Sequence, residues 1–189
     1  MLPDTLQSRR HSIRYPGYDY AQPGAYFVTI VTYHRECIFG QIVFKKIHLS
    51  PLGQIIGDLW EQIPMHFVNI EVEPFVIMPN HIHGIITIKD CRGTIYRAPT
   101  ADNHHDYLER FGNPVPGSLS TIIRTYKAAV SRLAKKKLGI TNIWQRNYYE
   151  HIIRNQSEME KIGQYILTNP DQWADDLENI SELTRRTQK

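Results

Sequence analysis

Two histidines separated by a single residue are the strongest chemical signal in this sequence. His81 and His83 lie in the stretch 78–84, between two apolar runs that are rich in β-branched residues. If the second run is a strand that begins at His81, both imidazoles point to the same face of a sheet. Two imidazoles on one face are a ready pair of metal ligands. The alternative is a pair of surface histidines on a half-exposed strand.

A tyrosine and an asparagine four residues apart form the second chemical signal. Tyr165 and Asn169 would share one side of a helix, at the border of its buried stripe. A tyrosine hydroxyl, with an ordinary pKa of about 10, is a weak nucleophile at neutral pH, so its attack on a phosphodiester needs a Lewis acid on the phosphate. Two histidine nitrogens and one asparagine oxygen could bind a divalent ion, and such a mixed set suits Mn²⁺ or Mg²⁺. A half-buried structural tyrosine is the alternative.

The elements that would position these residues alternate between strands and helices. The composition of three stretches predicts β-structure: residues 26–33, a hairpin over 70–88 and residues 143–153. Ser50 is a good N-cap for one amphipathic helix and Ser118 begins a second, and Pro64 and Gly139 would end them. This order matches the ferredoxin-like β-α-β-β-α-β arrangement, an α+β fold with an antiparallel sheet and both helices on one face.

The predicted helix that carries Tyr165 is an addition to that arrangement. Ser157 and Glu160 form a capping box at its start. The helix should end near Thr168, because Pro170 disfavours the α conformation at Asn169. The charged stretch after it is expected to be a short helix followed by a frayed tail.

A length of 189 residues, 41% of them hydrophobic, suits one globular domain with a core. No apolar run approaches the roughly 20 residues that a membrane span needs, and the polar N-terminus lacks a signal peptide, so we expect a cytoplasmic protein without a membrane partner. The sequence has two cysteines, so we do not expect a framework of disulfides to stabilise the fold. We expect an N-terminal arm (1–22), a domain (23–173) with a loop insertion at about 89–117, and a tail (174–189).

Basic residues are concentrated on the helix that begins at Ser118. The net charge of the chain is only +3, which by itself does not imply a nucleic-acid partner. The helix nevertheless has a face that could contact phosphates, although a solvated helix face explains it as well. The basic residues selected there as candidate DNA contacts are Arg124, Lys127, Arg132, Lys135 and Lys136.

The ordered set of motifs resembles a known family of enzymes. His81-Ile82-His83, followed downstream by Tyr165-Ile-Leu-Thr-Asn169-Pro170, is similar to the HUH single-tyrosine transposases, and most similar to the REP-associated tyrosine transposases of bacteria. The stretches 16–29, 76–83 and 143–154 also resemble that family, so that the similarity extends over about residues 11–173. The His-x-His motif alone is weakly specific, whereas the full ordered set is strongly specific.

The resemblance implies a DNA-cleaving enzyme. Tyr165 would be the nucleophile that breaks single-stranded DNA and leaves a 5′-phosphotyrosine and a free 3′-hydroxyl. His81, His83 and Asn169 would bind the divalent metal. The family acts on imperfect palindromes that fold into hairpins, so the partner would be single-stranded or hairpin DNA, contacted by the basic helix and by Arg154. Family members work as monomers or as homodimers. We expect a metal-dependent endonuclease and strand transferase that functions in DNA transposition.

A nucleic-acid-binding module without catalytic activity is the competing interpretation. Such modules place aromatic side chains on the free face of a ferredoxin-like sheet. They have no need of a histidine pair, or of a tyrosine and an asparagine aligned on a helix. Binding without a metal and without cleavage would favour this interpretation.

Overall fold

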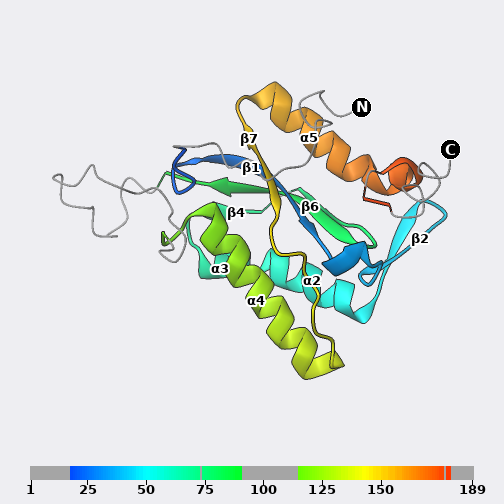
Figure 1. Cartoon of the computed structure of the whole chain (residues 1–189). Helices are drawn as coiled ribbons and strands as arrows, with labels where there is room; N and C mark the ends of the chain where they lie inside the picture. The colour runs from blue at the N-terminus through cyan, green and yellow to red at the C-terminus, as the bar shows by residue number, and fades with distance from the viewer. Residues whose placement is uncertain (1–17, 73, 91–114, 177, 180–189) are drawn as a thin grey trace.

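An antiparallel five-stranded sheet forms the centre of the protein (Figure 1). The computed structural model describes residues 18–72, 74–90, 115–176 and 178–179. The sheet has the order β4-β6-β1-β7, and β5 also pairs with β6. Its strands are β1 (Gly24–Val31), β4 (Ile70–Glu71), β5 (Phe75–Ile77), β6 (His81–Ile88) and β7 (Tyr149–Ile153). The predicted ferredoxin-like α+β arrangement is therefore confirmed.

Helices cover both faces of this sheet (Figure 1). Helices α2 (Pro51–Glu61) and α4 (Leu119–Leu138) pack on one face, against a core that includes Tyr26, Ile82 and Ile86. Helix α5 (Gln156–Thr168) packs on the opposite face, against a smaller cluster. That cluster contains Phe27, Ile85, Ile153, Ile162 and Ile166. Side chains that alternate along β1 and β6 thus enter two different cores.

Serine side chains cap the two helices on this face of the sheet, and both helices start where the sequence predicted. Ser50 accepts a hydrogen bond from the backbone N–H of Gly53, and Ser118 does the same for Thr121. Helix α4 ends at Gly139, whose φ of 69° is left-handed and suits glycine at a helix end. Pro64 does not follow the first helix directly, because α2 ends at Glu61 and a short helix α3 (Ile63–His66) begins two residues later.

Helix α5 begins two residues earlier than its predicted capping box. Its N-cap is Asn155, whose side chain accepts a hydrogen bond from the N–H of Glu158. Ser157 lies inside the helix, so the prediction of Ser157 as the cap was wrong. The helix ends at Thr168 as predicted, but Asn169 has α-helical angles of −57° and −40° and begins the 3-10 helix η2 (Asn169–Asp175). The steric effect of Pro170 therefore did not move Asn169 out of the α region.

Two other parts of the β-structure differ from the prediction. The first strand of the hairpin is interrupted, because Pro74 separates β4 from β5 and cannot donate a ladder hydrogen bond. The last strand begins only at Tyr149, and the preceding residues make a single bridge between Thr32 and Trp144. A separate two-stranded sheet, β2 (Gly40–Val43) and β3 (Lys46–Leu49), had no counterpart in the prediction.

The predicted arm, insertion and tail lie largely outside the described residues, so their boundaries stay predictions. The described end of the arm is anchored: Tyr20 is buried, and its carbonyl accepts a hydrogen bond from the N–H of Leu119 at 3.0 Å. Within the parts of the chain that the structure describes, no helix is both long and apolar enough to cross a bilayer.

Gly84 allows the close approach of α2 to strand β6. A Cβ atom at this position would lie 2.5 Å from Cζ2 of Trp60 and 3.1 Å from Cβ of Phe75. The Trp60 ring is completely buried and packs edge-on against Tyr126 of α4, with 5.2 Å between the ring centroids. The ring therefore has no room to move aside.

We predict that Gly84→Ala lowers the free energy of unfolding by about 1–3 kcal/mol, because the new methyl group overpacks the Trp60 contact. Urea denaturation followed by tryptophan fluorescence measures this change. Gly163→Ala is the matched control, because its Cβ would meet Pro74 at an ordinary 3.6 Å. Alanine also favours a helix interior, so the control should be neutral or stabilising. Equal destabilisation by both substitutions would contradict the Trp60 argument.

Candidate active site

The two histidines of β6 both lie on the face of the sheet that α5 covers. In the pairing of β1 with β6, Thr29 is opposite His83 and Val31 is opposite His81. His81 is completely buried and His83 is 4% exposed. Their ring centroids are 4.4 Å apart. The prediction that both imidazoles share one face is confirmed, but they are buried rather than half-exposed.

Asn80 determines the tautomer of His81. The Nδ2 atom of Asn80 donates to the carbonyls of Arg35 and Glu178, at 3.1 and 2.6 Å. This orientation leaves the Oδ1 atom of Asn80 facing Nδ1 of His81 at 2.9 Å. Because an amide oxygen can only accept, Nδ1 of His81 carries the proton. The lone pair of His81 is then on Nε2, the atom that faces the interior of the site.

His83 is held on both sides of its ring by polar contacts. Its Nδ1 atom lies 2.9 Å from Oγ1 of Thr29, and its Nε2 atom lies 3.3 Å from the hydroxyl oxygen of Tyr165. Both contacts are satisfied when Nδ1–H donates to Thr29 and Nε2 accepts from the Tyr165 hydroxyl. Phe27 stacks on the imidazole with 5.2 Å between the ring centroids. A polar partner on β1 and an aromatic neighbour thus fix the orientation of this ring.

Helix α5 brings Tyr165 to the histidines. Ile162 and Ile166 are completely buried against the sheet, so the helix cannot rotate without exposing them. Tyr165 is half-buried at the border of this stripe, where the sequence placed it, and it meets Phe27 edge-on at 6.2 Å between the ring centroids. Asn169 is more buried than predicted, with 1% of its surface exposed.

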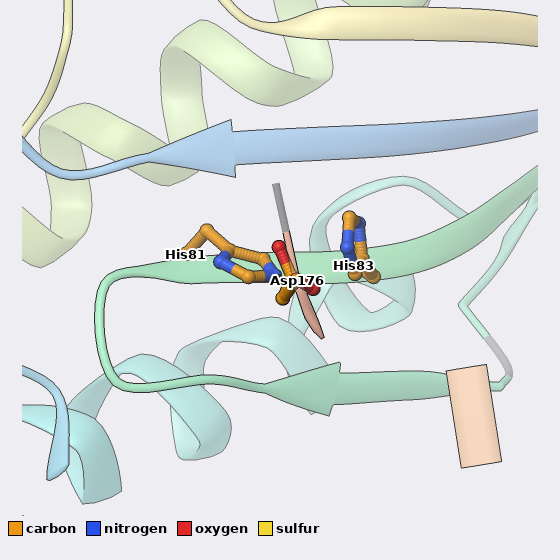
Figure 2. A group of neighbouring side chains, drawn as sticks. All are labelled: His81, His83 and Asp176. Atoms are coloured by element: carbon orange, nitrogen blue, oxygen red, sulfur yellow. Dashed lines mark ion pairs between the residues drawn. The ribbon is translucent and has the colours of Figure 1, made fainter. Parts of the chain in front are cut away.

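Asp176 completes the group of polar atoms, and sequence reasoning missed it. The structure brings a carboxylate oxygen of Asp176 and one nitrogen each of His81 and His83 within 4.8 Å of one another (Figure 2). Asp176 Oδ2 lies 3.9 Å from Nε2 of His81, and Nδ2 of Asn169 donates to the same oxygen at 3.4 Å. Figure 2 shows the carboxylate between the two imidazoles. Trp173 in a charged tail was a signal that this segment docks on the domain.

The donor set fits a divalent cation. Three ligand atoms that are each about 2.1 Å from one ion lie about 3.0–3.6 Å from one another. The atoms of this cluster, which lie within 4.8 Å of one another, would therefore have to move closer together when an ion binds. The side chains of His81 and Asp176 are 0% and 4% exposed, and the pair is too far apart for a hydrogen bond. Oδ1 of Asn169 is also buried and has no hydrogen-bond partner among the described residues. A buried acceptor of this kind suits a cation.

The segment that carries Asp176 is fastened to the domain by buried polar contacts. Asp176 Oδ1 accepts a hydrogen bond from the N–H of Glu178 at 2.7 Å. The Glu178 side chain is completely buried and forms an ion pair with Arg35 at 3.1 Å. The carbonyl of Glu178 is held by Asn80, so one amide side chain links this segment to His81.

Residues of β7 near the site have structural partners. His151 Nε2 lies 2.7 Å from Oε1 of Glu158 and thereby ties β7 to the first turn of α5. Burial opposes the ionisation of Glu158, but hydrogen bonds from the Arg154 N–H and from His151 outweigh it and lower the pKa of the carboxyl. Tyr149 is opposite Thr29 in the β1–β7 pairing and so lies on the same sheet face as His83.

The basic residues selected as DNA contacts lie on α4, on the other side of the sheet from the histidines, with the exception of Arg154. Helix α4 covers the face of the sheet opposite to α5 (Figure 1). Of the residues selected on this helix, Arg124, Arg132, Lys135 and Lys136 are exposed. Lys127 is partly buried and donates to the carbonyls of Gln145 and Asn147, and burial lowers its pKa to about 8. Arg154 is exposed where β7 leads into α5, so it lies at the N-terminal end of this helix, whereas Tyr165 lies near the C-terminal end.

Comparison with known proteins places the chain in a family. It is 41% identical over 170 residues to an uncharacterised protein of Haemophilus influenzae, and the match covers 88% of this chain and 91% of that protein. The two proteins belong to one family. A second H. influenzae protein, provisionally described as a REP-associated tyrosine transposase, is 23% identical over 152 residues, which cover 80% of this chain and 73% of that protein.

A solved structure has the same fold. It is the structure of a REP-associated tyrosine transposase bound to a REP hairpin, with a TM-score of 0.52 and 21% identity. The match covers 87% of this chain and 72% of that one. No protein-family model matches the chain. The resemblance to REP-associated tyrosine transposases that the motifs indicated is thus confirmed.

We predict that Asn80→Ala loosens the segment around Glu178, because two buried hydrogen bonds and one partly buried one lose their partner. The free energy of unfolding should fall by about 2–4 kcal/mol. Hydrogen exchange of the Glu178 and Asn179 amides should become faster than that of the sheet. Asn155→Ala is the matched control, because it removes only an exposed helix cap and should cost about 1 kcal/mol. Unchanged exchange at these two amides would contradict the role given to Asn80.

Proposed function

We propose that this protein is a metal-dependent single-stranded DNA endonuclease and strand transferase, with Tyr165 as its nucleophile. The observation that carries the proposal is the convergence of one phenol, two imidazoles and one carboxylate at a single place. The Tyr165 hydroxyl lies 3.3 Å from His83, although 82 residues separate them in the chain. A structural tyrosine would not need a buried histidine pair beside its hydroxyl.

Four residues would hold the divalent ion, either Mg²⁺ or Mn²⁺. His81 and His83 would each offer the lone pair of Nε2, Asn169 would offer Oδ1, and Asp176 would offer a carboxylate oxygen. Thr29 and Asn80 would keep the two rings oriented through Nδ1. When bound, the ion would polarise the scissile phosphate and stabilise its developing charge.

The covalent step would exchange one phosphate ester for another. The Tyr165 oxygen attacks the phosphorus of a single strand, the Tyr165 O–P bond forms, and the bond from phosphorus to the 3′-oxygen breaks. The phenol gives up its proton as it attacks, and the departing 3′-oxygen takes up a proton to become a hydroxyl. Because the 5′-phosphotyrosine keeps the energy of the phosphodiester, a 3′-hydroxyl can reverse the step and join strands without ATP.

All the proposed site residues come from one chain. His81, His83, Tyr165 and Asp176 converge without help from a second copy. A complete site within one monomer therefore suits the monomeric action of some family members better than sites shared by a dimer. The solved relative is bound to a REP hairpin, and we propose hairpin DNA as the substrate of this protein too. Arg154 would contact DNA at the N-terminal end of α5, whereas the basic residues of α4 would contact phosphates on the opposite face of the sheet.

We predict that Tyr165→Phe abolishes the covalent adduct with a hairpin oligonucleotide in the presence of Mn²⁺, because phenylalanine lacks the attacking oxygen. Denaturing electrophoresis of the labelled DNA detects the adduct as a shifted band. Tyr149→Phe is the matched control on the same sheet face and should form the adduct at the wild-type rate. An adduct with Tyr165→Phe would show that another residue is the nucleophile. Hairpin binding by the wild type without any cleavage would instead favour a non-catalytic binding module.

We predict that Asp176→Asn weakens Mn²⁺ binding about 10- to 100-fold, because it removes the only anionic donor of the cluster. Isothermal titration calorimetry without DNA measures the affinity. Asp171→Asn is the matched control, since Asp171 is exposed on the same 3-10 helix. Loss of binding in His83→Ala together with wild-type affinity in Asp176→Asn would show that the ion needs the histidines but not this carboxylate.

A further inference from the structure

The hairpin of β2 and β3 is outside the five-stranded sheet. Among the strands of the described residues, these two pair only with each other, from Gly40 opposite Leu49 to Val43 opposite Lys46. Phe44 and Lys45 form the two-residue turn at the tip. Residues at the base of the hairpin, such as Phe39 and Leu49, pack in the larger hydrophobic core, but residues 40–48 belong to neither core. Its tip therefore has no evident role in holding the fold together.

Phe44 is a poor residue for this turn in terms of folding alone. Its φ is 47° and that of Lys45 is 63°, both left-handed. Two-residue turns with left-handed angles at both positions strongly favour Asn-Gly, because larger side chains collide with the backbone there. The Phe44 side chain is also 95% exposed, so no packing offsets this cost. A contact with another molecule would explain an aromatic ring at such a place.

The charges around Phe44 favour a polyanion. Lys45 and Lys46 are exposed beside it, and the hairpin sequence from Gly40 to Leu49 contains no acidic residue. An aromatic ring flanked by cations is the combination with which proteins bind single-stranded nucleic acid, by stacking on bases while contacting phosphates. Other exposed apolar side chains, such as Met65 and Val68, have no lysine next to them in the chain.

The hairpin lies next to the candidate active site. Strand β3 packs against η2, the 3-10 helix that runs from Asn169 towards Asp176 (Figure 1). The base of the hairpin is also fixed, because Ser50, which follows β3, donates from its backbone N–H to the carbonyl of Phe39 at 2.9 Å. Because β3 contacts the segment that leads to Asp176, a DNA strand bound at the histidines could also contact the hairpin.

We propose that Phe44 stacks on an unpaired base of the single-stranded DNA next to the site, while Lys45 and Lys46 contact its phosphates. The inference rests on the proposed function, since it assigns part of the substrate to this hairpin. The β2–β3 hairpin is then a DNA-binding element that holds the single strand beside Tyr165. Its occupant is a nucleobase and not a second protein.

The test is a hairpin oligonucleotide whose single-stranded flank carries 2-aminopurine at successive positions. Phe44→Asn is the main variant, because asparagine tolerates left-handed angles and should leave the melting temperature unchanged or higher. Its affinity for the oligonucleotide, by fluorescence anisotropy, should fall about 5- to 100-fold, the range that base stacking supplies. Quenching of one 2-aminopurine position should be lost as well. Phe44→Trp should restore both, and Met65→Asn, the matched exposed control, should change neither.

Two results would overturn the inference. One is wild-type affinity and quenching in Phe44→Asn while wild-type protein binds and cleaves the DNA, which leaves the proposed function intact. The other is that Phe44→Asn binds DNA like the wild type but sediments as a different oligomer, which would mean that Phe44 contacts a second copy of the protein. Failure of the wild type to bind or cleave the oligonucleotide would instead reject the proposed function, and the inference with it.

Discussion

The pairing of β1 with β6 is the constraint on which the rest of the structure depends. Eight residues of each strand are in register, and this register puts His81 and His83 on the face of the sheet that α5 covers. A shift by one residue would turn both imidazoles into the core under α2 and α4. Gly84 supports the register, because only a residue without a side chain fits beside Trp60 on that other face.

The two faces of the sheet have different tasks. The larger core under α2 and α4 is closed by the aromatic contact of Trp60 with Tyr126 and by the hydrogen bond from the Tyr126 hydroxyl to the Ile56 carbonyl. The smaller cluster packs α5 against the sheet through a few apolar side chains. The polar side chains of His81, His83 and Asp176 lie beside this cluster. Because the large core under α2 and α4 stabilises the sheet, the face under α5 can carry more polar residues. A candidate active site can be placed on that face.

Local signals predicted much of this fold and part of the site. The alternation of β6 placed both histidines on one face, and the helical spacing placed Tyr165 at the border of the buried stripe, because both depend on periods of the backbone itself. That the Tyr165 hydroxyl lies near the histidines followed from the chemistry of the motifs and from the resemblance, and not from the spacing. Asp176 could not be found in this way, since a 3-10 helix and buried polar contacts carry it back to the sheet. The hairpin at Phe44 was missed because its turn has neither of the residues that normally mark such a turn.

The geometry around His83 also limits where a reaction can occur. Nε2 has one lone pair, and in this structure it faces the Tyr165 hydroxyl at 3.3 Å. The same lone pair would bind a cation, so the phenol and an ion would compete for one atom. A phenol that gives up this hydrogen bond stays tethered to α5, whose Ile162 and Ile166 are completely buried. The released oxygen would therefore remain close to the ligand cluster, which is the position that the proposed attack on a phosphate would require.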